Sequence, residues 1–511
     1  MIRWLAALAL AIVCTTGAQA QTAEEVHAAE RARFGFGELR RGADGNANGA
    51  NPANTDESKV GRFGLPPLFT SSSVPTPEGW AARRAELVRL VEDNWVGRIP
   101  EVVSQFRIVW RKEKVEGAPS EAEAEHWVGQ VIAPDGRMGP TIDATLTFPA
   151  QADGAPAFVE YTYVWPGGRA PNFGGNGPRP PDSVRTALDH GFVHVAYRPQ
   201  LLQSDSGATM QQGVIGLARW PRERTDWGAL RAWAWGASQL REEMARDPRV
   251  NGERISLAGH SRFGKGVLVA AAFDHAFADA NVSSSGAGGA KLMRRDFGER
   301  WENLTASGEF HWFTPNAMTY SGSGKTVADL PIDAHTLIAL RAPRPLFVTS
   351  GMADKGDSWV DPTGMWMAVR AAQPAWGLFG NAMPTDIMPE PGSDHDAFYK
   401  LGWYQHTEGH VPWPGYEEFF EHEARFAGPR ASMLPYTDPV KRHRKRRGMA
   451  EEIKPAPRPS STSAGSALAG RLLSSPPVPG RCCARARRTP PRSPPQDRSA
   501  VRPASTRPLR R

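Results

Sequence analysis

The stretch Arg254-Ile-Ser-Leu-Ala-Gly-His-Ser-Arg-Phe-Gly-Lys-Gly266 predicts a strand, a sharp turn and a helix in immediate succession. The apolar, β-branched beginning ends at Gly259, and the small residues from Gly264 onward are typical of a closely packed helix. Ser261 falls at the turn between the two elements. Such a turn lifts the serine oxygen above the edge of a sheet, where the next backbone N–H groups face whatever the serine attacks. The stretch therefore predicts an α/β fold with a serine nucleophile.

This turn is close to the G-x-S-x-G pattern of serine hydrolases, with one difference. The second glycine stands one place late, at Gly264, because Phe263 occupies its usual position. A Gly-x-Ser here can also be a simple loop whose hydroxyl caps the helix. Arg262 and Lys265 favour the nucleophile, because cations weaken the first turn of a helix and therefore imply an anionic ligand that compensates.

Charge and cysteine content exclude several classes of protein. Residues 441–511 contain 19 Lys and Arg against three Asp and Glu, a net charge of +16. The whole chain has a net charge of +7, so residues 1–440 carry −9. An acidic body argues against nucleic acid as a partner. The cysteines stand at positions 14, 482 and 483, outside the body of the chain, so the sequence excludes a disulfide framework and thiol catalysis there.

The chain of 511 residues divides by composition into four parts. Residues 1–20 have the basic start, apolar run and small-residue end of a secretory signal peptide, so we expect a secreted or periplasmic protein without a membrane span. Residues 21–75 are polar and predict a loosely packed N-terminal arm. Residues 440–511 are basic and rich in proline and arginine, which predicts a disordered tail. Residues 76–430 then form the catalytic domain, which we expect to be monomeric.

The segments around the turn predict the sheet and its helices. Apolar and polar residues alternate, as in antiparallel strands, over 103–112, 126–132 and 141–148. A β-α-β pattern follows, with strands over 157–164 and 191–197 and a helix over 182–190 between them. Further strands are expected over 280–285 and 345–350. Other helices are expected from residue 76 and over 227–246, 292–303 and 415–426. We therefore expect a three-layer α/β-hydrolase fold with a mostly parallel central sheet and an antiparallel N-terminal meander.

Attack by a serine requires a base, a carboxylate that orients the base, and donors for the oxyanion. In this fold the chain order is serine, acid, histidine. The aspartates between Asp354 and Asp361 follow the strand at 345–350, and His410 follows a glycine just before the last helix, with His395 and His406 as alternatives. The body contains no H-E-x-x-H, cysteine-pair or P-loop motif, so we predict neither a metal nor a cofactor.

Several separated motifs resemble those of the glucuronoyl esterases, carbohydrate esterase family fifteen, of bacterial type, over roughly residues 75–430. The family pattern G-x-S-R-x-G-K stands here as Gly259-His-Ser261-Arg262-Phe-Gly264-Lys265. Further matching blocks lie at 226–236, 285–290, 330–335 and 342–345. The resemblance implies hydrolysis of the ester that joins 4-O-methyl-glucuronic acid of glucuronoxylan to lignin alcohols, without a cofactor.

The resemblance also implies roles for single residues. Arg262 would stabilise the oxyanion beside the backbone N–H that follows the serine, and a charged donor should do so better than a neutral one. The uronic acid ring would be held by Lys265, Trp359, Glu299 and Glu309. Each glutamate could instead form a surface ion pair.

The resemblance offers two positions for the triad acid. Many members carry a glutamate where this chain has Ser284, and others use the first aspartate of D-x-W-x-D-P, which stands here as Asp357-Ser-Trp359-Val-Asp361-Pro362. Asp357 is therefore the expected acid, Asp354 is the alternative nearer the strand end, and Asp361 is expected to form a turn. Two other functions stay open: another carbohydrate or aryl ester hydrolase on the same fold, and a catalytically inactive polysaccharide-binding protein, which the missing acid at Ser284 favours.

Overall fold

The computed structural model describes residues 21–70, 75–116, 119, 121–164, 182–322, 324–383, 386–393 and 399–427. The expected signal peptide, His395 and the expected tail lie outside these residues. None of the helices within these ranges has the length and apolar character that crossing a membrane requires.

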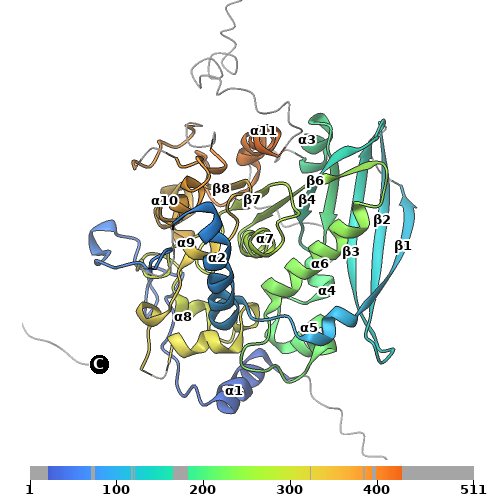
Figure 1. Ribbon diagram of the computed structural model, residues 1–511. Helices are drawn as coiled ribbons and strands as arrows, with labels where there is room; N and C mark the ends of the chain where they lie inside the picture. Colours follow the sequence, from blue (N-terminus) through green and yellow to red (C-terminus); the bar gives the residue numbers. More distant parts are fainter. Residues whose placement is uncertain are drawn as a thin grey trace, which may run out of the picture. The chain divides into compact units, whose positions relative to one another are not determined.

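One sheet organises the described residues, with nine strands in the order β1-β2-β3-β5-β4-β6-β7-β8-β9 (Figure 1). The strands are β1 Arg107–Val115, β2 Ala122–Ile132, β3 Met138–Pro149, β4 Ala155–Tyr161, β5 Val193–Tyr197, β6 Val250–His260, β7 Ala280–Ser283, β8 Leu346–Ser350 and β9 Leu401–Gln405. The pairs β1·β2, β2·β3 and β3·β5 are antiparallel, and every pair from β5 to β9 is parallel. This topology confirms the expected fold class, a mostly parallel sheet with an antiparallel beginning.

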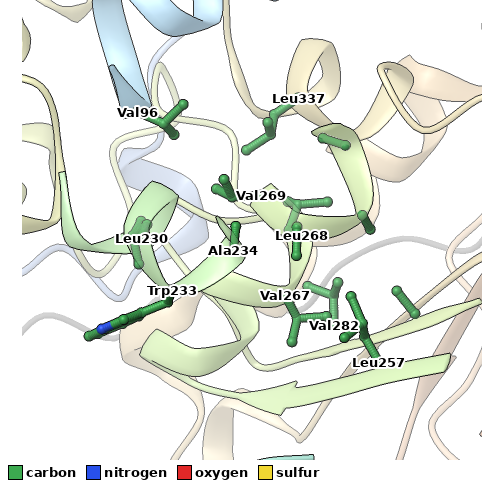
Figure 2. Packing of buried hydrophobic residues seen from close by; sticks show 14 of the residues in the cluster. Val96, Leu230, Trp233, Ala234, Leu257, Val267, Leu268, Val269, Val282 and Leu337 are labelled. Carbon is green, nitrogen blue, oxygen red and sulfur yellow. The ribbon is translucent and has the colours of Figure 1, made fainter. Parts of the chain in front are cut away.

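Helices cover both faces of this sheet. The α-helices of the described residues are α1 Ala23–Phe34, α2 Pro77–Val91, α3 Ser183–Asp189, α4 Pro199–Leu202, α5 Val214–Ala218, α6 Ala229–Met244, α7 Arg262–Phe273, α8 Trp301–Leu304, α9 Ala334–Ala339, α10 Pro362–Gly377 and α11 Tyr416–Phe426. The larger apolar cluster joins α6, α7, α9 and α10 to one face, and Figure 2 shows α7 packed between α6 and strands β6 and β7. A smaller aromatic cluster holds α3 and α11 to the other face.

The charged segment 292–303 is not the helix that we expected, since only Trp301–Leu304 is helical. The reason is that its polar groups have partners outside a helix. The buried Lys291 ammonium donates to the carbonyl oxygens of Arg295 and Glu299 at 3.1 and 2.7 Å. Arg294 donates to Ile332 O. The backbone N–H groups of Met293 and Arg294 donate to the carboxylate of Asp333 instead of to helical carbonyls, and a periodicity argument cannot detect such bonds.

The N-terminal segment is also more closely packed than its composition predicts. Helix α1 begins with a capping box between Thr22 and Glu25. Its residue Glu30 binds the guanidinium of Arg222 through both carboxylate oxygens at 2.8 Å, and the two side chains are 5% and 0% exposed. The expectation of a loose arm is therefore wrong for this helix, because its partners lie far away in the sequence.

We expect Glu30→Gln to lower the free energy of unfolding by about 3–5 kcal/mol, because it leaves the buried Arg222 charge without a counter-charge. Urea denaturation followed by circular dichroism measures the change. The control is Glu38→Gln, which removes the partner of Arg31 at a carboxylate that is 95% exposed and should leave stability unchanged. Equal effects of the two substitutions would contradict the assignment of α1 as part of the core.

Candidate active site

Ser261 stands at a tight turn between β6 and α7. Its φ of +58° and ψ of −127° are unusual for a residue with a side chain, and its N–H donates to Ser283 O at 2.9 Å. A Cβ atom on Gly259 would lie 2.5 Å from Phe263 O, and one on Gly264 would lie 2.7 Å from Ser283 O. Helix α7 therefore passes over β6 and β7 too closely for any other residue at these two positions.

The same packing explains why the second glycine stands one place late. Phe263, which occupies the usual glycine position, is fully buried. Its ring packs against Trp233, with ring centroids 5.4 Å apart, and against Tyr163, at 4.2 Å. The close contact with β7 is made at Gly264 instead, so this variant of the pattern still forms a strand-to-helix turn.

His410 and Asp357 meet at the ends of neighbouring strands. His410 Nδ1 lies 2.6 Å from Asp357 Oδ1, and the Asp357 side chain is completely buried while the histidine ring is 37% exposed. Asp357 Oδ2 accepts from the hydroxyl of Ser284 and from the N–H of Gly351, both at 2.7 Å. The two acid positions suggested by the family resemblance therefore converge, because Ser284 touches the carboxylate that contacts His410.

The alternative acid and bases have different surroundings. Asp354 is exposed. The Nδ1 atom of His406 accepts from the backbone N–H of Glu408 at 3.3 Å. Asp361 is the N-cap of α10, with φ +54°, and its carboxylate binds Arg295, which agrees with a turn-forming role. The geometry therefore favours Asp357 and His410 over these alternatives.

Arg262, the first residue of α7, extends from the turn. Its Nη1 donates to Asp205 Oδ2 at 2.8 Å, and its Cζ lies 5.4 Å from the centroid of the Trp312 ring. Its Nε is buried and has no hydrogen-bond partner among the described residues. A buried N–H without an acceptor costs free energy that a ligand oxygen can recover, so Arg262 is suited to bind an oxyanion.

Lys265, one turn further along α7, forms a buried ion pair. Its ammonium donates to Glu299 Oε2 at 3.0 Å and to Ser285 O at 2.9 Å, and the two charged side chains are 5% and 4% exposed. The N–H of Glu299 donates to the carbonyl oxygen of Trp359 at 2.9 Å. The structure therefore brings Lys265, Glu299 and Trp359 together, and the surface ion pair considered for Glu299 is wrong because this pair is buried.

Glu309 is a carboxyl group without a counter-ion in contact. Its Oε2 is buried and has no hydrogen-bond partner among the described residues. Burial, with a smaller contribution from the charge of Glu299, raises the pKa of Glu309 to about 8, against the opposing effects of Lys265 and Arg262. At neutral pH this group is therefore a neutral acid, which can both donate and accept a hydrogen bond.

Two residues near this site were not identified from the sequence. Asp205 receives the Arg262 guanidinium, and the ring of His260 lies 4.3 Å from that of His410. Asp205 stands in a loop without a motif. His260 directly precedes the serine in the quoted stretch, and that adjacency was the only available signal.

We expect the stability of the protein to depend on pH through Glu309. Because the pKa of Glu309 in the folded state, about 8, is above its ordinary value of 4.5, the folded chain binds more protons than the unfolded chain between these values. Stability should therefore fall as pH rises from 4.5 to about 8 and this contribution should then level off. Melting temperatures of the wild type and Glu309→Gln measure it, and parallel pH profiles for the two proteins would refute a neutral Glu309.

Comparison with known proteins relates this site to one family. Residues 185–380 match the family model for fungal glucuronyl esterases. The chain is 27% identical over 350 residues to a 4-O-methyl-glucuronoyl methylesterase of Hypocrea jecorina, covering 66% of this chain and 64% of that protein. It is 35% identical over 203 residues to a carbohydrate esterase from an unknown prokaryotic organism, covering 39% of this chain and 45% of that protein. The chain thus spans less than two thirds of the length of both curated relatives.

A solved structure extends the likeness over the whole domain. The glucuronoyl esterase of carbohydrate esterase family fifteen from Teredinibacter turnerae is 36% identical, with a TM-score of 0.72. The match covers 79% of this chain and 99% of the Teredinibacter chain. Identity at this level over a complete relative shows that the chain belongs to the glucuronoyl esterases, carbohydrate esterase family fifteen.

Proposed function

We propose that this chain is a secreted serine esterase that hydrolyses the ester between 4-O-methyl-glucuronic acid of glucuronoxylan and lignin alcohols. The observation that carries the proposal is the hydrogen bond of 2.6 Å between His410 and Asp357 beside the turn that bears Ser261. The His410 ring contacts that of His260, the residue directly before Ser261. The chain order serine, acid, histidine is that of a serine hydrolase, and these two contacts support a triad of Ser261, His410 and Asp357.

We propose that these residues act as follows. His410 takes the proton of Ser261 as its oxygen attacks the ester carbon, and Asp357 orients the imidazole and stabilises the imidazolium. Ser284 and Gly351 hold the second oxygen of Asp357. The backbone N–H after the serine and the Arg262 guanidinium stabilise the oxyanion. His410 then protonates the leaving alcohol and activates the water that releases the acid.

The buried charges beside the turn support a uronic acid as the acyl group. Lys265 and Glu299 are already paired, so they present a fixed polar surface rather than a free charge. The neutral Glu309 offers both a donor and an acceptor to sugar hydroxyls, and Trp359 offers a half-buried ring. Residues 1–20 support export, and we propose that the enzyme acts as a monomer.

One assay tests the reaction directly. The wild type should hydrolyse benzyl glucuronate faster than a matched acetyl or feruloyl ester, and Ser261→Ala should abolish turnover while the melting temperature and binding of acidic xylo-oligosaccharides persist. Residual activity above about one part in a thousand would argue against the serine mechanism. A preference for the other esters would favour another ester hydrolase on this fold, and an inactive wild type that binds the oligosaccharide would favour a binding protein.

Asp357 is the proposed triad acid. Asp357→Asn should keep the fold but lower kcat by about a hundred- to ten-thousand-fold, because the buried charge that orients and stabilises protonated His410 is lost. Asp354→Asn, a matched substitution three residues away at an exposed carboxylate, should leave kcat nearly unchanged. Steady-state kinetics on the best ester measure both. The reverse ranking would transfer the role to Asp354.

A further inference from the structure

Asp205 connects two parts of the site. It stands in the loop that follows α4, and its side chain is 7% exposed. One carboxylate oxygen accepts from Arg262 Nη1 at 2.8 Å. The other accepts from His311 Nε2 at 3.0 Å and from Trp312 Nε1 at 2.6 Å. A single buried carboxylate thus links the first residue of α7 with the short helical turn Phe310–Trp312.

We infer that Asp205 is a positioning residue that holds the Arg262 guanidinium where it meets the oxyanion, an inference that rests on the function proposed above. The Arg262 side chain is 43% exposed and has several rotatable bonds, so without an anchor it would sample many orientations. A donor accelerates the reaction only if it is already oriented toward the charge that develops. The Asp205 carboxylate restricts one end of the guanidinium and leaves the buried Nε–H of Arg262 without an acceptor among the described residues.

The electrostatic balance supports this role. Burial by itself would raise the pKa of Asp205, but the hydrogen bond from His311 and the charge of Arg262, with the bond from Trp312, hold that pKa below its ordinary value. Burial lowers the pKa of His311, so the histidine is neutral at neutral pH and Arg262 is the cation that Asp205 faces. An ionised carboxylate in this position makes a charge-assisted bond with the arginine, which is stronger and more directional than a neutral one.

The same bonds place the sugar-binding segment relative to the oxyanion donor. His311 and Trp312 stand two and three residues after Glu309 along the chain. Because both donate to Asp205, a shift of the turn 310–312 would also disturb the carboxylate that holds Arg262. Asp205 acts through these protein donors, so its removal should change the rate of the chemical step more than the affinity for substrate.

A double-mutant cycle tests the inference. Asp205→Asn should lower kcat by about 10- to 100-fold, the order expected when an oxyanion donor loses its orientation, while KM changes by less than about threefold. In an Arg262→Met background the same substitution should cost nothing further, because the group through which Asp205 acts is gone. Asp205→Ser is measured in parallel. If the melting curve shows that Asp205→Asn folds poorly, Asp205→Ser replaces it in the cycle.

Two controls separate positioning from general structural damage. Asp279→Asn alters another fully buried carboxylate, paired with His422 at 2.6 Å, which has no contact with Arg262. It should lower the melting temperature but leave kcat of the folded enzyme unchanged. Trp312→Phe removes one donor to Asp205 but keeps a ring under Arg262 and the Arg262–Asp205 bond, so it should lower kcat by less than Asp205→Asn does.

The inference and the proposed function fail in different ways. If the wild type cleaves an acetyl ester but no glucuronate ester, the substrate proposal falls, and the cycle is run on the acetyl ester because every ester forms an oxyanion. Equal losses of kcat from Asp205→Asn in the two backgrounds, or an increase of KM alone, would overturn the role of Asp205. A wild type that cleaves no ester would overturn both proposals.

Discussion

The close passage of α7 over strands β6 and β7 is the constraint on which the site depends. Gly259 and Gly264 leave no room for a Cβ atom, and this contact forces Ser261 into a left-handed backbone conformation. The apolar packing of α7 offsets the cost of that strain through Phe263 and through Val267, Leu268 and Val269, which Figure 2 shows. The start of this helix then carries the proposed nucleophile Ser261, the guanidinium of Arg262 and the ammonium of Lys265 on one turn.

Around this turn the charges are paired so that their positions are fixed. Arg262 pairs with Asp205 and Lys265 with Glu299, and Asp357 makes a hydrogen bond with His410. Each pair joins α7, or the loop that follows β9, to a segment distant in the sequence, and each carboxylate has an exposed fraction of 7% or less. Because a buried carboxylate is costly unless it is paired in good geometry, separating these segments would cost free energy, most of all at the Lys265–Glu299 pair, which is buried on both sides. These pairs say little about the stability of the protein, but they fix the positions of the side chains around the turn.

Glu309 is the exception to this pairing. Without a counter-ion in contact it remains neutral, and the neighbouring Glu299 adds to that tendency. A protonated carboxyl avoids the repulsion that two charged glutamates would produce near one ligand. It also leaves an O–H donor available to a polar ligand. The site therefore combines paired charges, whose positions are fixed, with one neutral group that can both donate and accept a hydrogen bond.

The strand-turn-helix around Ser261, and the succession of antiparallel strands followed by parallel ones, could be predicted from the sequence because they depend on local pattern. The family resemblance identified Asp357 through a motif, although periodicity alone could not distinguish it from Asp354. Asp205 could not be predicted, because a loop aspartate has no signal until the fold brings Arg262 and Trp312 to it. The failure at 292–303 has the same origin, since its charged residues resemble a solvated helix and are in fact paired across the fold.

The N-terminal segment shows how such pairing reaches the site. Glu57 binds Arg295, and Arg295 also binds Asp361, the residue that begins α10 two positions after Trp359. Asn54 adds backbone bonds to the segment that carries Glu299, accepting the N–H of Gly298 at 2.8 Å. Residues expected to form a loosely packed arm therefore connect the loop before α10 with the segment that precedes Glu299. Because Gly298 directly precedes Glu299 and Asp361 lies two residues after Trp359, these bonds fix the chain beside both proposed substrate-binding residues.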